Sequence, residues 1–380
     1  MANASKRPRQ APTILYVGAI CQHSRFAAKV GPIAQSDVLK RIARIISTRQ
    51  SGFLSRYDAT SATKKKGAYL RQTGFSHVVM ITAHAPVLGG FFGALGWQAA
   101  HGPLDATSAH FWGCERPAEL TRWSSPDGDC EVLLISAAGD VPLLRPFDCP
   151  VTTPGGIFDI NMRTADSDWA RAFLIEHGWR ELVPSVAWRF GDIETKEGLY
   201  IQDDGIVLAV MQRLHPPLEG VQFDRMSTVF NSTQMVSDVE QTLAFLELAG
   251  FKRFIDHTGP LPGEGPKVLQ LEHHPPGSAG IHLSIAHPQA AMSGSIELID
   301  VPQHALQPLP SVPKGGRGLR ALCIPIDDIE QCYRRWKSSV WSGQIHQQLA
   351  HRDLPGVLNT LSFSVIAPDG GRLDLYQCPE

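Results

Sequence analysis

The sequence predicts an α+β protein built from a repeated unit, in which a strand and an amphipathic helix are followed by further strands. A phrase that ends in glycine and an aromatic residue recurs at residues 91–97, 172–179 and 244–251. A run typical of a strand precedes each phrase. A turn of the Asp-Gly or Ser-Gly type, followed by an apolar strand, closes each unit. Four such units of about 70–90 residues account for most of the chain.

Each element of the unit has its own local signal. The helices of the first three units end at Gly96, Gly178 and Gly250, because glycine adopts the left-handed conformation without a Cβ clash. Aspartates precede the later helices as candidate N-caps, and the fourth helix lacks a glycine stop. The opening strands are expected at residues 78–82, 157–163, 229–235 and 322–326, and the closing strands at 131–134, 206–208, 296–298 and 372–375.

Composition excludes several classes of protein. The chain has 380 residues, of which 43% are hydrophobic and 19% charged, as in a globular protein. A net charge of −2 gives no basic field for nucleic acid, and no apolar run is long enough to span a membrane. Seven cysteines without a CxxC pair indicate reduced thiols in the cytoplasm. No phosphate-binding motif is present, so we expect no nucleotide cofactor.

The segments SHVVMI…FFGALGW…SPDGDCEVLL and LCIPIDDIEQCYRRW…APDGGRLDLY resemble the vicinal oxygen chelate superfamily, which includes glyoxalase I, epimerases and extradiol dioxygenases. The resemblance implies four tandem βαβββ modules paired into two curled-sheet bowls. We expect modules one and two to form the first bowl at residues 73–218, and modules three and four the second at 219–380. Residues 1–72 lie outside the resemblance and contain a basic amphipathic helix.

The resemblance also implies candidate site residues, because ligands on facing strands converge in each bowl. In the N-terminal half, His77, Glu131 and Asp159 would hold a divalent metal, with Mn, Fe, Zn, Ni and Mg equally compatible. A register shift that turns Val132 inward would instead point Glu131 into solvent.

The C-terminal half would use Glu297 and Asp374 as an acid–base pair without metal, with Asn231 on the opening strand and a blank position at Ala321. Each of these residues also has a structural interpretation. His77 could bond to a carbonyl at the strand edge, and Asp159 could cap a turn after Gly155-Gly156. Glu297 and Asp374 could lie in water on the rim.

These features predict an enzyme that acts on a small oxygenated, cyclic or aromatic molecule by proton transfer, as an isomerase, epimerase or lyase. One alternative is a divergent extradiol dioxygenase, although neither half supplies the two histidines that such a site requires. A non-catalytic binding or resistance protein is the other. The expected partner is a small-molecule substrate, with neither nucleic acid nor membrane, and a homodimer is compatible with the fold.

Overall fold

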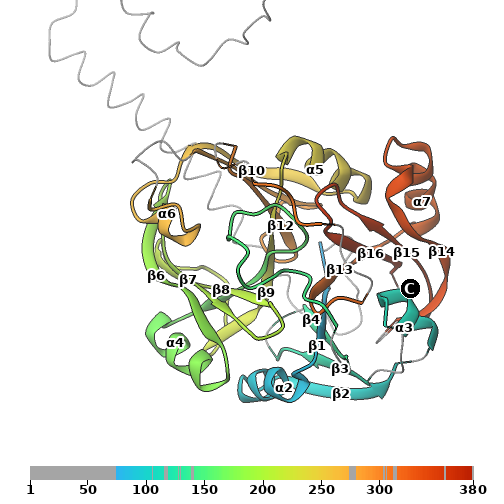
Figure 1. Ribbon diagram of the computed structural model, residues 1–380, viewed down its shortest axis with the longest axis horizontal. Coiled ribbons are helices and arrows are strands. Elements are labelled where there is room, and N and C mark those ends of the chain that lie inside the picture. Colours follow the sequence, from blue (N-terminus) through green and yellow to red (C-terminus); the bar gives the residue numbers. More distant parts are fainter. Residues whose placement is uncertain are drawn as a thin grey trace, which may run out of the picture. The chain divides into compact units, whose positions relative to one another are not determined.

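The computed structural model describes residues 74–378 except 105, 115–118, 127, 129, 138–140, 274–279, 303, 305, 311–314 and 355–356. The predicted basic helix and the rest of residues 1–72 therefore lie outside the described residues. The described chain forms four βαβββ modules in tandem, which confirms the predicted α+β class (Figure 1).

The first two modules contain the predicted strands and helices, with one added helix, α3. Module one consists of β1 (His77–Thr82), α2 (Ala85–Ala94), β2 (Gln98–Pro103), α3 (Ala106–Trp112), β3 (Glu119–Ser124) and β4 (Glu131–Ser136). Module two consists of β5 (Asp159–Thr164), α4 (Ser167–Glu176), β6 (Arg180–Phe190), β7 (Ile193–Ile201) and β8 (Val207–His215).

The last two modules repeat the same order. Module three consists of β9 (Met226–Met235), α5 (Val239–Leu246), the 3-10 turn η1 (Glu247–Ala249), β10 (Lys252–Pro260), the short helix α6 (Gly265–Val268), β11 (Gly280–His287) and β12 (Ser295–Asp300). Module four consists of β13 (Gly318–Ile326), α7 (Ile329–Ser338), η2 (Ser342–Gln344), β14 (Ile345–Leu354), β15 (Val357–Ile366) and β16 (Arg372–Gln377).

The predicted pairing of the modules is wrong. Modules one and four share one curled sheet, here the outer sheet, in the order β14-β15-β16-β13-β1-β4-β3-β2. Modules two and three share the other, here the central sheet, in the order β10-β11-β12-β9-β5-β8-β7-β6. Residues 73–218 and 219–380 therefore do not each form a bowl. Every module leaves one edge of its opening strand unpaired, and the repeat pattern does not specify which module covers that edge.

The opening strands meet at the centre of each sheet. Strand β1 pairs antiparallel with β13, and β5 pairs antiparallel with β9. On its other side each opening strand runs parallel to the closing strand of its own module, as β1 does with β4. Each bowl is thus assembled from two modules about a central antiparallel pair.

The helix ends confirm the local predictions. Asp166, Asp238 and Asp328 accept hydrogen bonds from backbone amides at the starts of α4, α5 and α7. The three glycine stops have positive φ angles of 78°, 81° and 88° at Gly96, Gly178 and Gly250. The caps and stops fix where each helix leaves and rejoins its sheet.

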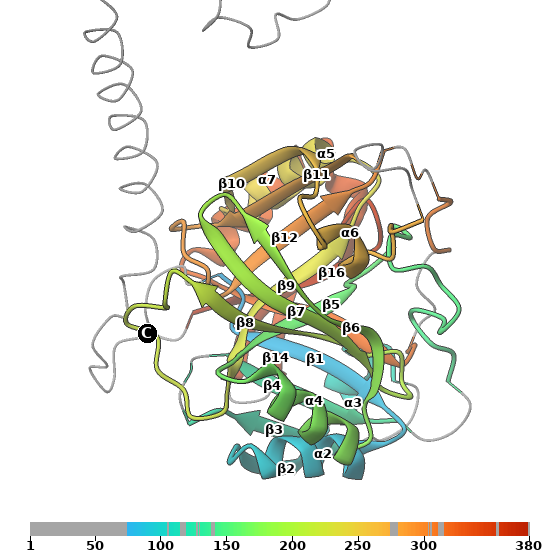
Figure 2. The same ribbon diagram turned by 90° about the vertical axis from the view of Figure 1, so that its left-hand side faces the viewer.

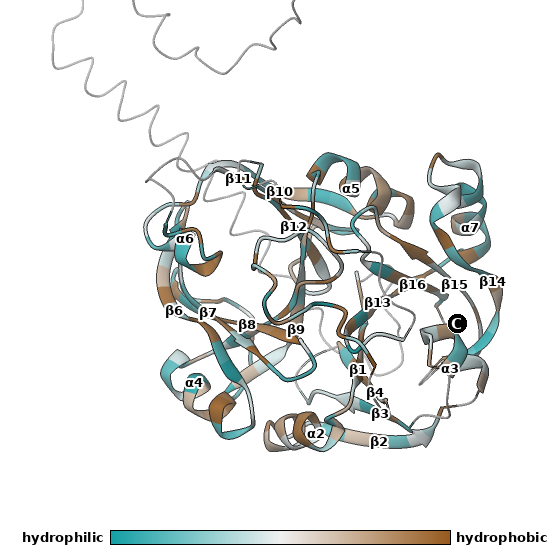
Figure 3. Cartoon of the chain, in the orientation of Figure 1, coloured by the Kyte–Doolittle hydropathy of each residue, from teal (hydrophilic) through white to brown (hydrophobic). Residues whose placement is uncertain are grey.

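One hydrophobic cluster joins the faces of both sheets that the helices cover. It contains Val78 and Met80 from β1, Ile160 and Met162 from β5, and the inward side chains of α2, α4, α5 and α7. Figures 2 and 3 show these helices outside the curled sheets, with hydrophobic and hydrophilic residues both present on α5 and α7. Neighbouring residues of a strand point to opposite faces, so His77 and Asp159 point away from this shared core.

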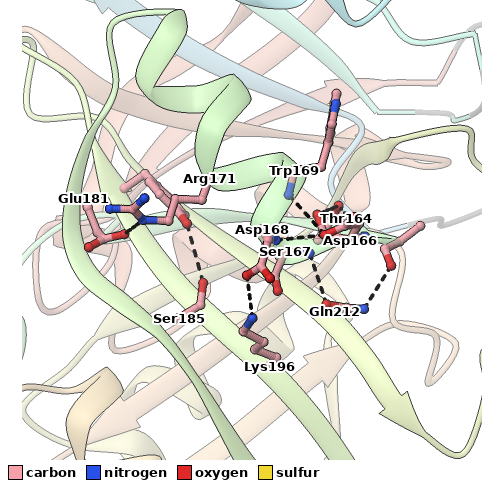
Figure 4. A network of polar contacts seen from close by, with 12 residues as sticks. Thr164, Asp166, Ser167, Asp168, Trp169, Arg171, Glu181, Ser185, Lys196 and Gln212 are labelled. Carbon is pink, nitrogen blue, oxygen red and sulfur yellow. Dashed lines mark hydrogen bonds and ion pairs between the residues drawn. The ribbon is translucent and has the colours of Figure 1, made fainter.

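Polar contacts hold α4 on the central sheet (Figure 4). Lys196 Nζ donates to Asp168 Oδ1 at 2.8 Å, and Arg171 pairs with Glu181 on β6. Gln212 on β8 accepts from the Ser167 amide and donates to the Ala165 carbonyl.

No helix among the described residues is both long and apolar enough to cross a membrane.

We expect Gly128→Ala to destabilise the protein where the two sheets meet. A Cβ atom on Gly128 would lie 2.0 Å from Thr228 Cγ2, on the opening strand of module three. Crowding of this kind costs about 1–3 kcal/mol, measured as a loss of unfolding free energy in urea. The matched control is Gly90→Ala on α2, where a Cβ meets nothing within 4 Å. That change should add about 0.5–1 kcal/mol, because alanine is the better helix former. Equal effects of the two substitutions would contradict the proposed contact.

Candidate functional site

Two carboxyl groups and a threonine form a polar row on the concave face of the central sheet. Thr233 on β9 is the strand partner of both Asp159 on β5 and Glu297 on β12. Its Oγ1 donates to Glu297 Oε2 at 3.0 Å, and its backbone N–H donates to Asp159 Oδ1 at 3.1 Å. Directly opposed strand residues point to the same face. Thr233 therefore links the two carboxyl groups.

Two asparagines lie beside this row. Asn161 Nδ2 donates to Asp159 Oδ1 at 2.9 Å and to Asn231 Oδ1 at 3.0 Å. Asn231 Nδ2 in turn donates to Ser295 Oγ at 2.7 Å. Both amides are almost fully buried, so these hydrogen bonds fix the orientation of the Asp159 carboxyl group.

A third carboxyl group, Glu197 on β7, completes the set. Trp188 Nε1 on β6 donates to Glu197 Oε2 at 2.8 Å. Burial raises the pKa of Glu197 to about 8, and the charges of Glu297 and Asp159 add to the effect. We call Asp159, Glu197 and Glu297 the carboxyl cluster.

Burial also raises the pKa of the other two members of the carboxyl cluster to values near neutral pH. It raises the pKa of Glu297 to about 7 and that of Asp159 to about 7, against the lowering effect of hydrogen bonds from Thr233. Asp159 is 2% exposed, whereas Glu297 keeps part of its surface accessible although protein surrounds it. Glu297 is therefore the member best placed to meet a ligand.

Apolar side chains surround the carboxyl cluster. Val207 and Ala209 on β8 and Met235 on β9 belong to a second hydrophobic cluster, separate from the core between the sheets. Helix α6 contacts β6 and β7 and adds Val268 to it. This low-polarity lining causes the raised pKa values, because it disfavours the ionised carboxylates.

The carboxyl cluster should make stability fall as pH rises. The folded protein keeps these groups protonated up to about pH 7–8, whereas the unfolded chain ionises them near pH 4. The folded state then binds more protons in that window, so the unfolding free energy decreases from pH 4 to pH 8.

We expect Glu197→Gln to reduce this loss, because glutamine still accepts from Trp188 but carries no charge. Its gain over the wild type should be small at pH 5 and on the order of 3 kcal/mol at pH 8, in urea denaturation. Glu176→Gln, at an exposed site on α4, is the control. The same pH dependence in wild type and Glu197→Gln would count against this electrostatic account.

A different polar row crosses the concave face of the outer sheet. Strand pairing places Glu131, His77, Cys323, Asp374 and Ser364 side by side on β4, β1, β13, β16 and β15. His77 Nε2 lies 3.1 Å from Glu131 Oε2, and Ser124 Oγ donates to Glu131 Oε1 at 2.5 Å. Burial alone would raise the pKa of Glu131, but hydrogen bonds from His77 and Ser124 outweigh it and lower that pKa. Glu131 therefore faces inward, and Val132 lies in the core.

Asp374 is held by hydrogen bonds to both of its carboxyl oxygens in this row. Trp112 Nε1 on α3 donates to its Oδ2 at 2.8 Å, and Arg372 Nε donates to its Oδ1 at 2.7 Å. Both Asp374 and Arg372 are almost fully buried. Phe111 and Trp112 of α3 lie in the hydrophobic cluster on this face, so the added helix fills part of the outer bowl.

The structure regroups the predicted site residues. His77 and Glu131 meet, but Asp159 lies on the other sheet beyond the shared core, so the predicted three-ligand metal site is wrong. Glu297 and Asp374 are likewise on different sheets and cannot form the predicted acid–base pair. The residues that join Glu297 are Asp159 and Asn231, because modules two and three share a sheet.

Sequence reasoning missed Glu197, Asn161 and Thr233. Thr195 and Glu197 are buried on alternate positions of β7, although the run Glu194-Thr195-Lys196-Glu197 is typical of a solvated strand. Asn161 and Thr233 lie two residues beyond Asp159 and Asn231 and therefore on the same face. The two-residue period of side-chain direction along a strand was the signal that could have identified Asn161 and Thr233.

Known proteins resemble this chain in structure. No family model matches the sequence, and no curated protein matches it. Glyoxalase I from Zea mays superposes with a TM-score of 0.53 at 13% identity, over 80% of this chain and 92% of the maize chain. A mutant of the same enzyme gives 0.53 at 14% identity, over 80% and 94%.

The chain has the vicinal oxygen chelate fold. This confirms the resemblance found in the sequence, at the level of the fold. The tandem arrangement extends over most of the length of both chains. The fold accounts for the curled sheets, and the chemistry must come from the side chains that line them.

The vicinal oxygen chelate fold suggests a site for a divalent metal, but the side chains of this chain do not form one. No group of three His, Cys, Asp or Glu side chains among the described residues could hold a metal ion. In the outer bowl, burial raises the pKa of Cys323 well above its usual range, so the neighbour of His77 is a protonated thiol. Asp374 is already engaged by Trp112 and Arg372. In the central bowl, Asp159, Glu197 and Glu297 do not converge as three ligands of one ion.

Proposed function

We propose that the central bowl catalyses proton transfer on a small oxygenated, cyclic or aromatic molecule, as an isomerase, epimerase or lyase. The observation that carries this proposal is the pair of carboxyl groups, Asp159 and Glu297, linked through Thr233 with pKa values near 7. A general acid or base works best when its pKa lies near the operating pH.

The two carboxyl groups have distinct roles in the proposal. Glu297 is partly accessible, and its Oε1 makes no hydrogen bond to the described residues, so this oxygen is the one that takes and returns the substrate proton. Asp159 is buried and oriented by Asn161, and its charge opposes ionisation of Glu197. Repulsion within the carboxyl cluster keeps part of it protonated at neutral pH, so that an acid and a base coexist.

The lining of the bowl supports the substrate class. Apolar residues such as Val207, Met235 and Leu283 surround the carboxyl cluster. A flat ring can pack on such a surface while its oxygens face the carboxyl groups. No step of the proposal depends on a metal, since the donor set does not fit one.

Exchange of substrate hydrogen with solvent tests the proposal directly. The protein is incubated in D2O with a panel of cyclic and aromatic hydroxyketones and dicarbonyls, and loss of the C–H signal beside the carbonyl is followed by NMR. We expect catalysed exchange for at least one member of the panel. A ligand that binds tightly and is recovered with all its protons would favour a binding protein instead. Oxygen uptake with catechols after anaerobic iron loading would favour the dioxygenase.

A further inference from the structure

The outer bowl contains buried polar atoms that have no partner among the described residues. Arg372 is 2% exposed and Arg320 6% exposed, yet both terminal nitrogens of Arg372 and Nε of Arg320 make no hydrogen bond to any described residue. The buried Ser364 Oγ likewise has no partner in this part of the chain. Ser364 is the strand partner of Asp374, and Arg372 lies two residues from Asp374 on β16, so all three point to one face. Buried polar atoms are nearly always satisfied in proteins, so this group indicates a missing ligand.

The local charge indicates which ligand is missing. Among the described residues, the guanidinium groups of Arg320, Arg352 and Arg372 face a single carboxylate, Asp374. Arg352 donates hydrogen bonds to neutral backbone carbonyls, including those of Gln348 and Ser362. Burial and the neighbouring Arg372 lower the pKa of Arg320 to about 10. Uncompensated buried cations are costly, and an anion would offset that cost.

The C-terminal end of α3 borders this group of three arginines. Two guanidinium groups lie over the ring of Phe111, with Arg372 Cζ 4.6 Å and Arg352 Cζ 4.8 Å from the ring centroid. A Cβ on Gly113 would lie 3.4 Å from Arg320 Nη2, so this guanidinium lies beside the α3 terminus. The same Cβ would lie 2.7 Å from the Gly315 backbone nitrogen, so Gly315 also packs against this end of α3.

We propose that the outer bowl binds a small-molecule oxyanion, a carboxylate or a phosphate group, between Arg320, Arg372 and Ser364. The planar fork of a guanidinium matches two oxygens of either group. Arg372 uses only Nε on Asp374, which leaves its forked end for the ligand. The site is separate from the carboxyl cluster, since it lies on the other sheet, and does not depend on the proposed proton transfer.

Thermal unfolding of the full chain with inorganic phosphate or glutarate, in buffers matched in ionic strength with NaCl, tests the site. We expect at least one of the two anions to raise the Tm saturably above the NaCl series. Phosphate alone would identify a phosphate ligand, and glutarate alone a carboxylate. Arg320→Gln should raise the Tm without ligand, by removing a cation that repels Arg372, and should abolish the rise with anion.

Matched variants separate site binding from general charge effects. Ser364→Ala should weaken binding about tenfold with little change in the unliganded Tm. Arg334→Gln, at an exposed position on α7, should leave the anion response unchanged. The proposal is overturned when neither anion acts beyond NaCl, or when Arg320→Gln responds like the wild type.

Discussion

Replacing Glu297 by glutamine is expected to lower the rate of solvent hydrogen exchange by about 100–10,000-fold. Glutamine preserves the shape of the side chain and can still accept from Thr233, but its amide cannot take a proton. The initial rate of deuterium incorporation into the best substrate of the panel measures the effect. Substrate binding, followed by calorimetry, should change far less than the rate.

The matched control for Glu297→Gln is Asp300→Asn. Asp300 lies on the same strand, β12, and burial raises its pKa to about 6, but its odd spacing from Glu297 places it on the other face. Asp300→Asn should keep the exchange rate within about twofold of the wild type, as expected for a group without a role in the transition state. If Glu297→Gln exchanges hydrogen at the wild-type rate, the central bowl does not catalyse the proton transfer.

Replacing Asp374 by asparagine is expected to destabilise the fold by about 3–5 kcal/mol. The change removes the carboxylate that faces Arg320, Arg352 and Arg372, while the new amide oxygen can still accept from Trp112. The buried cations would then repel one another without compensation. Urea denaturation followed by Trp fluorescence measures the loss.

A second substitution distinguishes lost charge from lost packing. Adding Arg372→Met to Asp374→Asn should recover more than half of the stability, because the cation that depends on Asp374 is then gone. The control is Glu330→Gln, from the exposed pair with Arg334, and it should cost less than about 1 kcal/mol. A loss for Asp374→Asn no larger than this control would mean that Asp374 does not stabilise the buried arginines.

The sequence by itself determined the repeating unit and the ends of its helices. Glycine stops and aspartate caps act within one helix, so their signals are local and Gly178 or Asp166 could be interpreted without a structure. The alternation of side chains along a strand likewise predicts that Asp159 and Glu297 point inward. Local backbone chemistry therefore defined a unit of a strand, a helix and further strands repeated four times, and the resemblance supplied the βαβββ module and its candidate inward residues.

Only the tertiary structure decided which inward residues meet. The free edge of each opening strand is satisfied by hydrogen bonds to any antiparallel strand, so the repeat could not show that β5 pairs with β9 and β1 with β13. That choice places Asp159 beside Glu297 and leaves Asp374 with the arginines. It also buries Glu197, whose local sequence is that of an exposed strand. Long-range packing sets these neighbours, and the neighbours set the charge and the chemistry of each bowl.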